Sequence, residues 1–229
     1  MKGLSVYVDC HSKKRFSWHF LAQSLTETTS MPLSIKPVNL KIIAKCKRNH
    51  RAHQPKEFSF LRFLVPYLKE IDGFSFFNYK ELDRIDIKDF FYIASCIPDT
   101  VVHIVKQNYN PENDINYLGQ KQYSYSLKSW WSLVISNCSH PKYQALLLDF
   151  INNATNTEPH RFTWLTDEEI CNLDLSWKWL VGEYVTKALI EPVKNLHWTA
   201  GEPYFKEYSN ADFCIRNHSV ENSILNAMN

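Results

Sequence analysis

Positive charge gathers in one stretch near the N-terminus. Between Glu27 and Glu57 the chain has no acidic residue but seven basic ones, Lys36, Lys41, Lys45, Lys47, Arg48, Arg51 and Lys56. A stretch of one sign is either a solvated loop or a loop that approaches an anionic ligand. His50 and His53 lie three residues apart within it, but a metal site needs a third ligand, and none is nearby.

Single charged side chains next to apolar runs form a second set of candidates. Arg62 stands inside the apolar stretch 58–68, so it either extends to the surface or has a buried anionic partner. Asp9 follows the apolar run 4–8, where a carboxylate either caps the next turn or hydrogen-bonds a ligand. A run of three acids begins at Asp167. Such a run is ordinary at a helix N-terminus, but it also supplies carboxylates for general acid–base chemistry.

Composition excludes several classes of site. The chain has 229 residues, and its 5 glycines are too widely spaced for G-x-G-x-x-G or the P-loop pattern. The 6 cysteines are also far apart, so C-x-x-C zinc and redox motifs are absent. We see no signal peptide and no apolar run of 18 residues, and therefore expect a cytoplasmic protein with reduced thiols and no transmembrane segment. A net charge of +2 argues against a nucleic-acid-binding protein.

The elements that must position these residues begin with a β–α–β pattern. The runs 4–8 and 33–40 are typical of strands, and 14–24 has helical spacing, which favours an α/β domain with parallel strands. Further strands are predicted at 74–77, 100–105 and 131–136. Helices are predicted at 58–68, ending near Pro66, at 86–93, and at 141–153 with Ser139 as a cap. The segment 159–208 is rich in aromatic residues without regular period. We expect a single domain over residues 1–216, followed by a polar tail at 217–229.

Five segments, in this order, resemble one family. They read KEFSFLRFLVP (56–66), FFNYKELDRIDIKDFF (76–91), SWWSLVISNCSH (129–140), HRFTWLTDEEICNLDLSWKWLVGEY (160–184) and LHWTAGEPYF (196–205). Together they are similar to the bacterial and viral GT-A glycosyltransferases related to glycosyltransferase family 8. The resemblance implies a GT-A-like nucleotide-diphospho-sugar transferase fold, an α/β domain with a central mixed sheet.

The resemblance also implies which residues bind a nucleotide sugar, most simply a UDP-sugar. The first strand and its loop would hold the nucleoside, through Tyr7, Val8, Asp9 and Cys10. Arg62 would face the donor. The His-x-x-x-Gly motif, here His197 and Gly201, would close on the phosphates and supply a ligand to Mn²⁺ or Mg²⁺. Asn137 ends a strand that carries polar contacts to donor or acceptor.

The chain departs from the family where the metal is held. The Asp-x-Asp motif is replaced by Asn78-Tyr79-Lys80. Divalent cations prefer carboxylate oxygens, whereas Asn offers one neutral oxygen and a charged Lys offers no lone pair. Three explanations remain open. Lys80 neutralises the leaving diphosphate without metal; or catalysis is lost and the protein only binds a sugar nucleotide or glycan; or the metal site is shifted onto nearby acids, Glu81, Asp83 and Asp86.

The sequence thus predicts transfer of a sugar from a nucleotide-sugar donor to a glycan or other acceptor. Lys80 is the candidate for stabilising the leaving group, and Asp167 is the candidate carboxylate on the acceptor side. Glu183 is the next choice for that carboxylate, although it is equally suited to a buried structural role. The alternative is a catalytically inactive relative that still binds sugar nucleotides or glycans.

Overall fold

The structure is a computed structural model, and the ranges that it describes are separated by gaps. They are residues 4–9, 15–30, 32–38, 62–69, 74–78, 82–83, 99–106, 132–146, 148–154, 158–181, 184, 193–198, 206 and 209–210. The predicted helix at 86–93 and the predicted tail at 217–229 lie outside these ranges.

The β–α–β opening predicted from the sequence is confirmed. Strand β1 (Leu4–Asp9) leads into helix α1 (Arg15–Thr28) and then strand β2 (Leu33–Val38). β1 and β2 are parallel, with Leu4 opposite Leu33. β2 lies at the edge of its sheet, and this position accommodates Pro37, which has no N–H to donate to a further strand.

A six-stranded mixed sheet forms the centre of the fold. It also contains β3 (Phe74–Asn78), β5 (Val102–Ile104), β6 (Leu133–Asn137) and β7 (Ile170–Asn172), in the order β2-β1-β3-β6-β5-β7. Only β6 runs against its two neighbours, whereas β1 with β3 and β5 with β7 are parallel pairs. The predicted strands at 74–77, 100–105 and 131–136 are therefore confirmed within a few residues.

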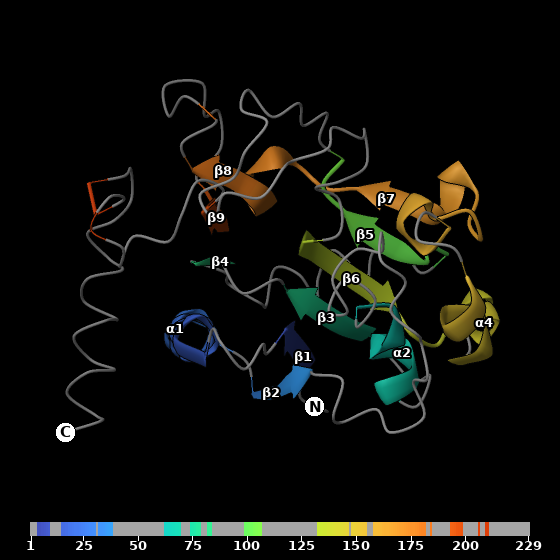
Figure 1. Cartoon of the computed structure of the whole chain (residues 1–229). Coiled ribbons are helices and arrows are strands. Elements are labelled where there is room, and N and C mark those ends of the chain that lie inside the picture. The colour runs from blue at the N-terminus through green and yellow to red at the C-terminus, as the bar shows by residue number, and fades with distance from the viewer. Residues whose placement is uncertain are drawn as a thin grey trace.

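A second sheet of three short strands lies beyond the carboxyl end of β3. It consists of β4 (Leu82–Asp83), β9 (Leu196–Trp198) and β8 (Trp179–Val181) in the order β4-β9-β8. In Figure 1 these strands lie on the left, β7 and α4 lie on the right, and β3, β6 and β5 lie between them. The aromatic segment without regular period thus contains strands of only three residues, too short to show an alternating pattern.

The helix predicted at 14–24 extends further, to Thr28, whereas two other helical segments are shorter than the sequence predicted. The apolar stretch around Arg62 contains α2 (Val65–Leu68), and the predicted helix at 141–153 is two elements, η5 (Pro141–Ala145) and α4 (Leu148–Asn153). His140 caps η5 in place of the expected Ser139, since its Nδ1 accepts a hydrogen bond from the N–H of Lys142 at 3.3 Å. The cause is Pro141, which forces the residue before it into an extended conformation. Three further 3₁₀ turns are η6 (Pro159–Arg161), η7 (Asp167–Glu169) and η8 (Leu175–Lys178).

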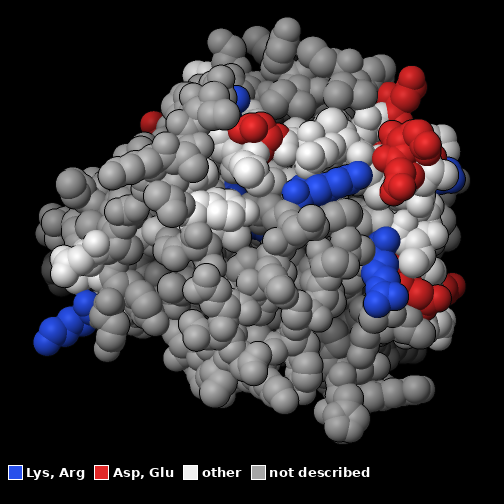
Figure 2. Space-filling model, turned by 90° about the horizontal axis from the view of Figure 1, so that it is seen from above, with Lys and Arg blue, Asp and Glu red and all other residues white. Residues whose placement is uncertain are grey.

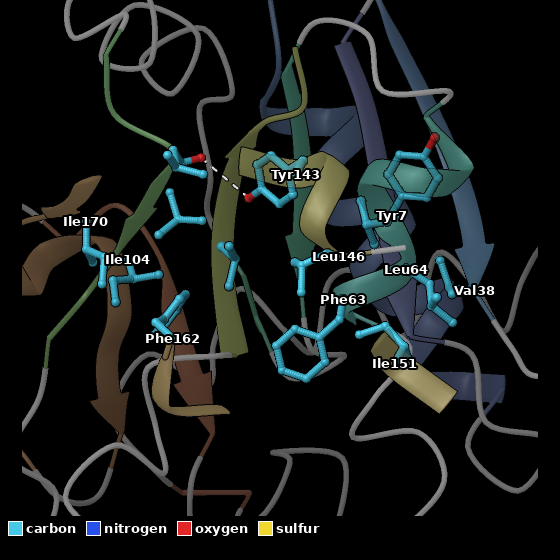
Figure 3. Packing of buried hydrophobic residues seen from close by; sticks show 14 residues of the cluster. Tyr7, Val38, Phe63, Leu64, Ile104, Tyr143, Leu146, Ile151, Phe162 and Ile170 are labelled. Carbon is cyan, nitrogen blue, oxygen red and sulfur yellow. Dashed lines mark hydrogen bonds between the residues drawn. The ribbon is translucent and has the colours of Figure 1, made fainter. Parts of the chain in front are cut away.

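Both faces of the central sheet are buried, because alternate residues of one strand point to opposite faces. On one face, Tyr7 belongs to a cluster with Phe63, Leu64 and Phe162, drawn in Figure 3, and the hydroxyl of Tyr143 donates to the carbonyl of Val101 at 3.4 Å. On the other face, residues next to Tyr7 along β1 pack against α1. That second cluster contains Val6, Val8, Leu21, Leu25, Leu133, Ile135, Leu173 and Trp177. Because both faces are buried, the packing determines which side chains of each strand point to which face.

A histidine interrupts the apolar pattern in the middle of the sheet. His103 lies on β5 opposite Ile135, is fully buried, and neither of its ring nitrogens has a hydrogen-bond partner. Burial lowers the pKa of His103 from 6.5 to about 4, because a charged imidazole is poorly solvated there. The native protein therefore holds this side chain in its neutral form.

Replacing His103 with Leu should reduce the sensitivity of the fold to acid. As the pH falls below 6.5 the unfolded chain binds the proton first, so the native state loses stability until the pH reaches about 4. Between pH 7.5 and pH 5 we expect His103→Leu to lose about 2 kcal/mol less free energy of unfolding than the unmodified chain, measured by urea denaturation. His19→Leu on α1 is the control, because His19 is exposed in the native state and remains in contact with water. Equal acid sensitivity of His103→Leu and the unmodified chain would contradict the prediction.

Candidate functional site

The carboxyl ends of β1 and β3 lie side by side where the strands of the central sheet end. We call this the Asp9–Asn78 edge; it is formed by strand ends and is not the lateral edge formed by β2. The two strands are parallel, with Val8 opposite Asn78, so Asp9 and Asn78 end their strands at the same edge. In open α/β sheets, ligands bind beyond the carboxyl ends of parallel strands. Two of the residues predicted from the sequence are therefore brought together where a ligand is expected.

The second sheet brings His197 to the same edge. Only three residues separate Asn78 from Leu82 on β4, and Leu82 pairs with His197 on β9. A chain of this length spans at most about 14 Å. His197 also pairs with Leu180 on β8, so it occupies the middle strand of the small sheet and is partly buried. The topology thus joins His197 to the end of β3, as the sequence predicted.

A buried lysine, which the sequence analysis did not single out, joins this site. Lys178 ends η8 directly before β8 and has none of its surface exposed. Burial, and secondarily the charge of Arg62, lower the pKa of Lys178 well below its ordinary value. Burial, and secondarily the charge of Lys178, lower the pKa of His197 from 6.5 to about 3. Lys178 therefore interacts electrostatically with both Arg62 and His197; we call the three residues the basic cluster.

The turn before Lys178 is fixed by its own hydrogen bonds. The carboxylate of Asp174 accepts from the N–H of Ser176 at 2.8 Å and caps η8. The side-chain amide of Asn195 donates to the carbonyl of Trp177 at 2.9 Å, and the N–H of Trp179 donates to the carbonyl of Asn195 at 2.9 Å. These bonds tie the start of β8 to the start of β9, so Lys178 and His197 are held on adjoining strands.

Tyr7 and Val8 lie on β1 just before the strand end that borders the site. Both side chains are buried in the core, Tyr7 on one face of the sheet and Val8 on the other. The ammonium of Lys36 lies 5.6 Å from the centre of the Tyr7 ring, a cation–π contact between neighbouring strands. The structure shows that these two side chains pack in the core. Their contact with a nucleoside stays a prediction.

Asn137 and Asp167 lie at the opposite edge of the sheet. β6 runs against β3, so Asn137 pairs with Phe74, four residues and about 13 Å from Asn78 along the strand. Asp167 begins η7, and the carbonyl of Glu169 in the same turn accepts a hydrogen bond from the N–H of Val101, whose own carbonyl accepts from the N–H of Asn137. Figure 2 shows acidic side chains gathered on its right-hand side, where Figure 1 places β7. The structure therefore does not bring these two predicted residues together with Asp9, Asn78 and His197.

The acids of η7 close a helix cap. The carboxylate of Glu169 accepts from the N–H of Thr166 at 2.9 Å and lies 3.4 Å from the ammonium of Lys142. The backbone hydrogen bond from Thr166 is the main reason why the pKa of Glu169 lies below its ordinary value. This sequence, Thr-x-x-Glu, is the signature of a capping box. The acidic run thus stabilises the start of β7.

The described residues do not suit a divalent cation. Among them there is no group of three or more His, Cys, Asp or Glu side chains that would hold a metal ion. Asn78 at the end of β3 offers one neutral amide oxygen, and the charge of a second basic group, Lys178, acts on His197. A cation repels a cation, and Mn²⁺ and Mg²⁺ need carboxylate oxygens. Lys80, Gly201, Cys10 and Glu183, which the sequence analysis placed in or near the site, lie outside the described residues. None of the described helices is long and apolar enough to cross a membrane.

Comparison with solved structures decides the fold. The galactosyltransferase LgtC, in a crystal structure with donor and acceptor sugar analogues, superposes with a TM-score of 0.60 over 96% of both chains, at 9% identity. The glycosyltransferase GlyE of Streptococcus pneumoniae TIGR4 gives a TM-score of 0.61 over 96% of this chain and 60% of its own, at 12% identity.

The chain has a GT-A-like fold. In sequence it is 29% identical to Protein CDI of Arabidopsis thaliana over 218 residues, which are 93% of this chain and 83% of that protein. No protein-family model matches it. The GT-A-like fold predicted from the five ordered segments is therefore confirmed, and in it the pairing of β4 with β9 joins His197 to the end of β3.

Placing aspartates at positions 78 and 80 should create a site for a divalent cation. In the double variant Asn78→Asp, Lys80→Asp, two carboxylates would follow β3 near His197, so Mn²⁺ with UDP should stabilise the fold by about 2–3 kcal/mol at 100 times the dissociation constant. The measurement is the melting temperature in the presence of UDP, with and without about 1 mM Mn²⁺. Lys142→Asp, at the opposite edge, controls for the added negative charge. A similar stabilisation of the unmodified chain by Mn²⁺ would contradict the prediction.

Proposed function

We propose that this protein is a glycosyltransferase that transfers a sugar from a nucleotide-sugar donor, a UDP-sugar, to a glycan or other acceptor, without a divalent cation. The observation that carries the proposal is the topology of a GT-A-like fold that joins His197 on β9 to the end of β3, beside the end of β1, with Lys178 on the turn before the neighbouring strand β8. The similar structure of LgtC was solved with donor and acceptor sugar analogues.

The proposed roles follow from charge and position. A nucleoside diphosphate leaves with negative charge on its phosphates, and fixed cations stabilise that charge most strongly where water is excluded. Arg62 and His197 are partly buried and so border on solvent, whereas Lys178 is fully buried. Lys80, two residues before Leu82, the partner of His197 on β4, would add a further cation to the same phosphates. Asp167 is left out of this site because it lies at the other edge of the sheet.

The test is release of the nucleoside diphosphate from a panel of donors, namely UDP-glucose, UDP-galactose, UDP-N-acetylglucosamine and GDP-mannose. We expect turnover of at least one UDP-sugar that EDTA changes by less than about twofold, because no metal takes part. Arg62→Ala should lower kcat/KM by roughly 10- to 100-fold, the effect of one charge-assisted hydrogen bond. Arg161→Ala is the matched control, since Arg161 is exposed on η6.

Two results separate the proposal from its alternatives. Activity that EDTA abolishes and Mn²⁺ restores would show that a metal is used. Binding of UDP without turnover of any donor would identify the protein as a sugar-nucleotide-binding relative. That second function is favoured by the replacement of both motif aspartates with Asn78 and Lys80.

A further inference from the structure

The Asp9–Asn78 edge extends across the sheet to the end of β7. Because β6 runs against both β3 and β5, the strands β1, β3, β5 and β7 all end at this edge. The register places Asn78 opposite Leu133. The next residue of β6, Val134, pairs with Ile104, and Ile104 pairs with Asn172. Asn172 therefore lies only one residue below the level of Asn78, three strands and about 14 Å away.

The side-chain amide of Asn172 is held in one orientation. Its Oδ1 accepts a hydrogen bond at 2.8 Å from the backbone N–H of Lys106, which follows β5. A backbone N–H can only donate, so the atom that faces it is the amide oxygen. Nδ2 therefore lies on the far side of the amide, and no described residue accepts a hydrogen bond from it. Since Asn172 is exposed, the end of β7 presents a fixed N–H donor at the surface.

An apolar side chain lies close to this donor in the sequence. Leu175 is one of the two large hydrophobic residues that the described ranges expose, and it lies within about 11 Å of Asn172 because only three residues separate them. A neutral N–H donor suits a neutral oxygen, and an apolar surface suits C–H groups. A sugar ring carries both kinds of group. A donor that is already fixed also loses less conformational entropy when it binds.

The distance from the end of β3 favours the acceptor over the nucleotide. In the proposed function the diphosphate of the donor lies near the ends of β1 and β3, where the small sheet brings His197. The acceptor must lie beside the transferred sugar and beyond the nucleotide. In open α/β sheets ligands lie along the carboxyl ends of the strands, so the end of β7 continues the same binding edge.

We infer that Asn172 binds the acceptor by donating a hydrogen bond from Nδ2 to a hydroxyl oxygen of a neutral glycan. The inference rests on the proposed function for the presence of an acceptor, and it narrows that acceptor to a carbohydrate. It makes Asn172 a specificity-determining residue, which the sequence analysis did not single out.

The experiment is an NMR titration of the ¹⁵N-labelled full chain, saturated with UDP, with lactose, cellobiose, maltose and chitobiose. The side-chain amide signals of Asn172 are assigned by their absence from the spectrum of Asn172→Asp. We expect at least one disaccharide to bind with a dissociation constant below about 10 mM and to shift these signals.

Two variants separate ligand binding from a structural role. Asn172→Asp keeps an oxygen for the N–H of Lys106 but has no N–H to donate, whereas Asn172→Ala loses both. We expect each variant to weaken disaccharide binding by roughly 5- to 10-fold, the effect of one hydrogen bond, and to leave the affinity for UDP within twofold. Asn153→Asp is the control for the added charge, because Asn153 is exposed on α4. It should bind the disaccharide as the unmodified chain does.

The outcomes also distinguish this inference from the proposed function. Disaccharide affinity that Asn172→Asp retains within twofold overturns the inference, even if donors are turned over, because the amide would then only hold Lys106. A parallel loss of UDP affinity also overturns it, since Asn172 would then act on the donor. The inference fails as well if none of the four disaccharides binds. A selective loss of disaccharide binding supports it, even if no donor is turned over.

Discussion

The pairing of β4 with β9 is the constraint on which the site depends. Without it, His197 would have no fixed relation to Asn78. The pairing involves only Leu82 with His197 and Asp83 with Leu196. It is reinforced on the other side of β9 by β8 and by the hydrogen bonds of Asn195 to the turn that holds Lys178. One short sheet therefore connects the end of β3 to two basic groups.

The charged groups near the Asp9–Asn78 edge differ in sign and in burial from those at the opposite edge. Basic groups are buried near the carboxyl ends of β1 and β3, whereas the acids of η7 are at or near the surface and are used for a cap and an ion pair. A buried charge interacts strongly with a ligand, while an exposed one is screened by water and salt. This difference, and not the net charge of +2, is the basis for the proposal of an anionic ligand.

The long central strands could be predicted from the sequence, and the short ones could not. β1, β3 and β6 are mainly apolar runs of five or six residues, and such runs can be recognised without a partner. Strands of three residues, such as β7, β8 and β9, gain their stability from neighbours that are distant in the sequence. Within the site, the ends of β1 and β3 and His197 followed from ordered motifs. Lys178 did not, because a lysine between two tryptophans looks like part of an aromatic packing segment. Asp167 was chosen as a carboxylate, although Thr166 and Glu169 already had the spacing of a capping box.

The edge strand β2 has a consequence for how the chain behaves at high concentration. An exposed sheet edge offers unpaired N–H and C=O groups to another molecule, and this is a common route to aggregation. Pro37 removes one donor from that edge, and Lys36 beside it adds a charge while its ammonium rests over the Tyr7 ring. Both residues are exposed. The cation–π contact and the proline therefore protect the sheet from pairing with a second chain, independently of any ligand that the protein binds.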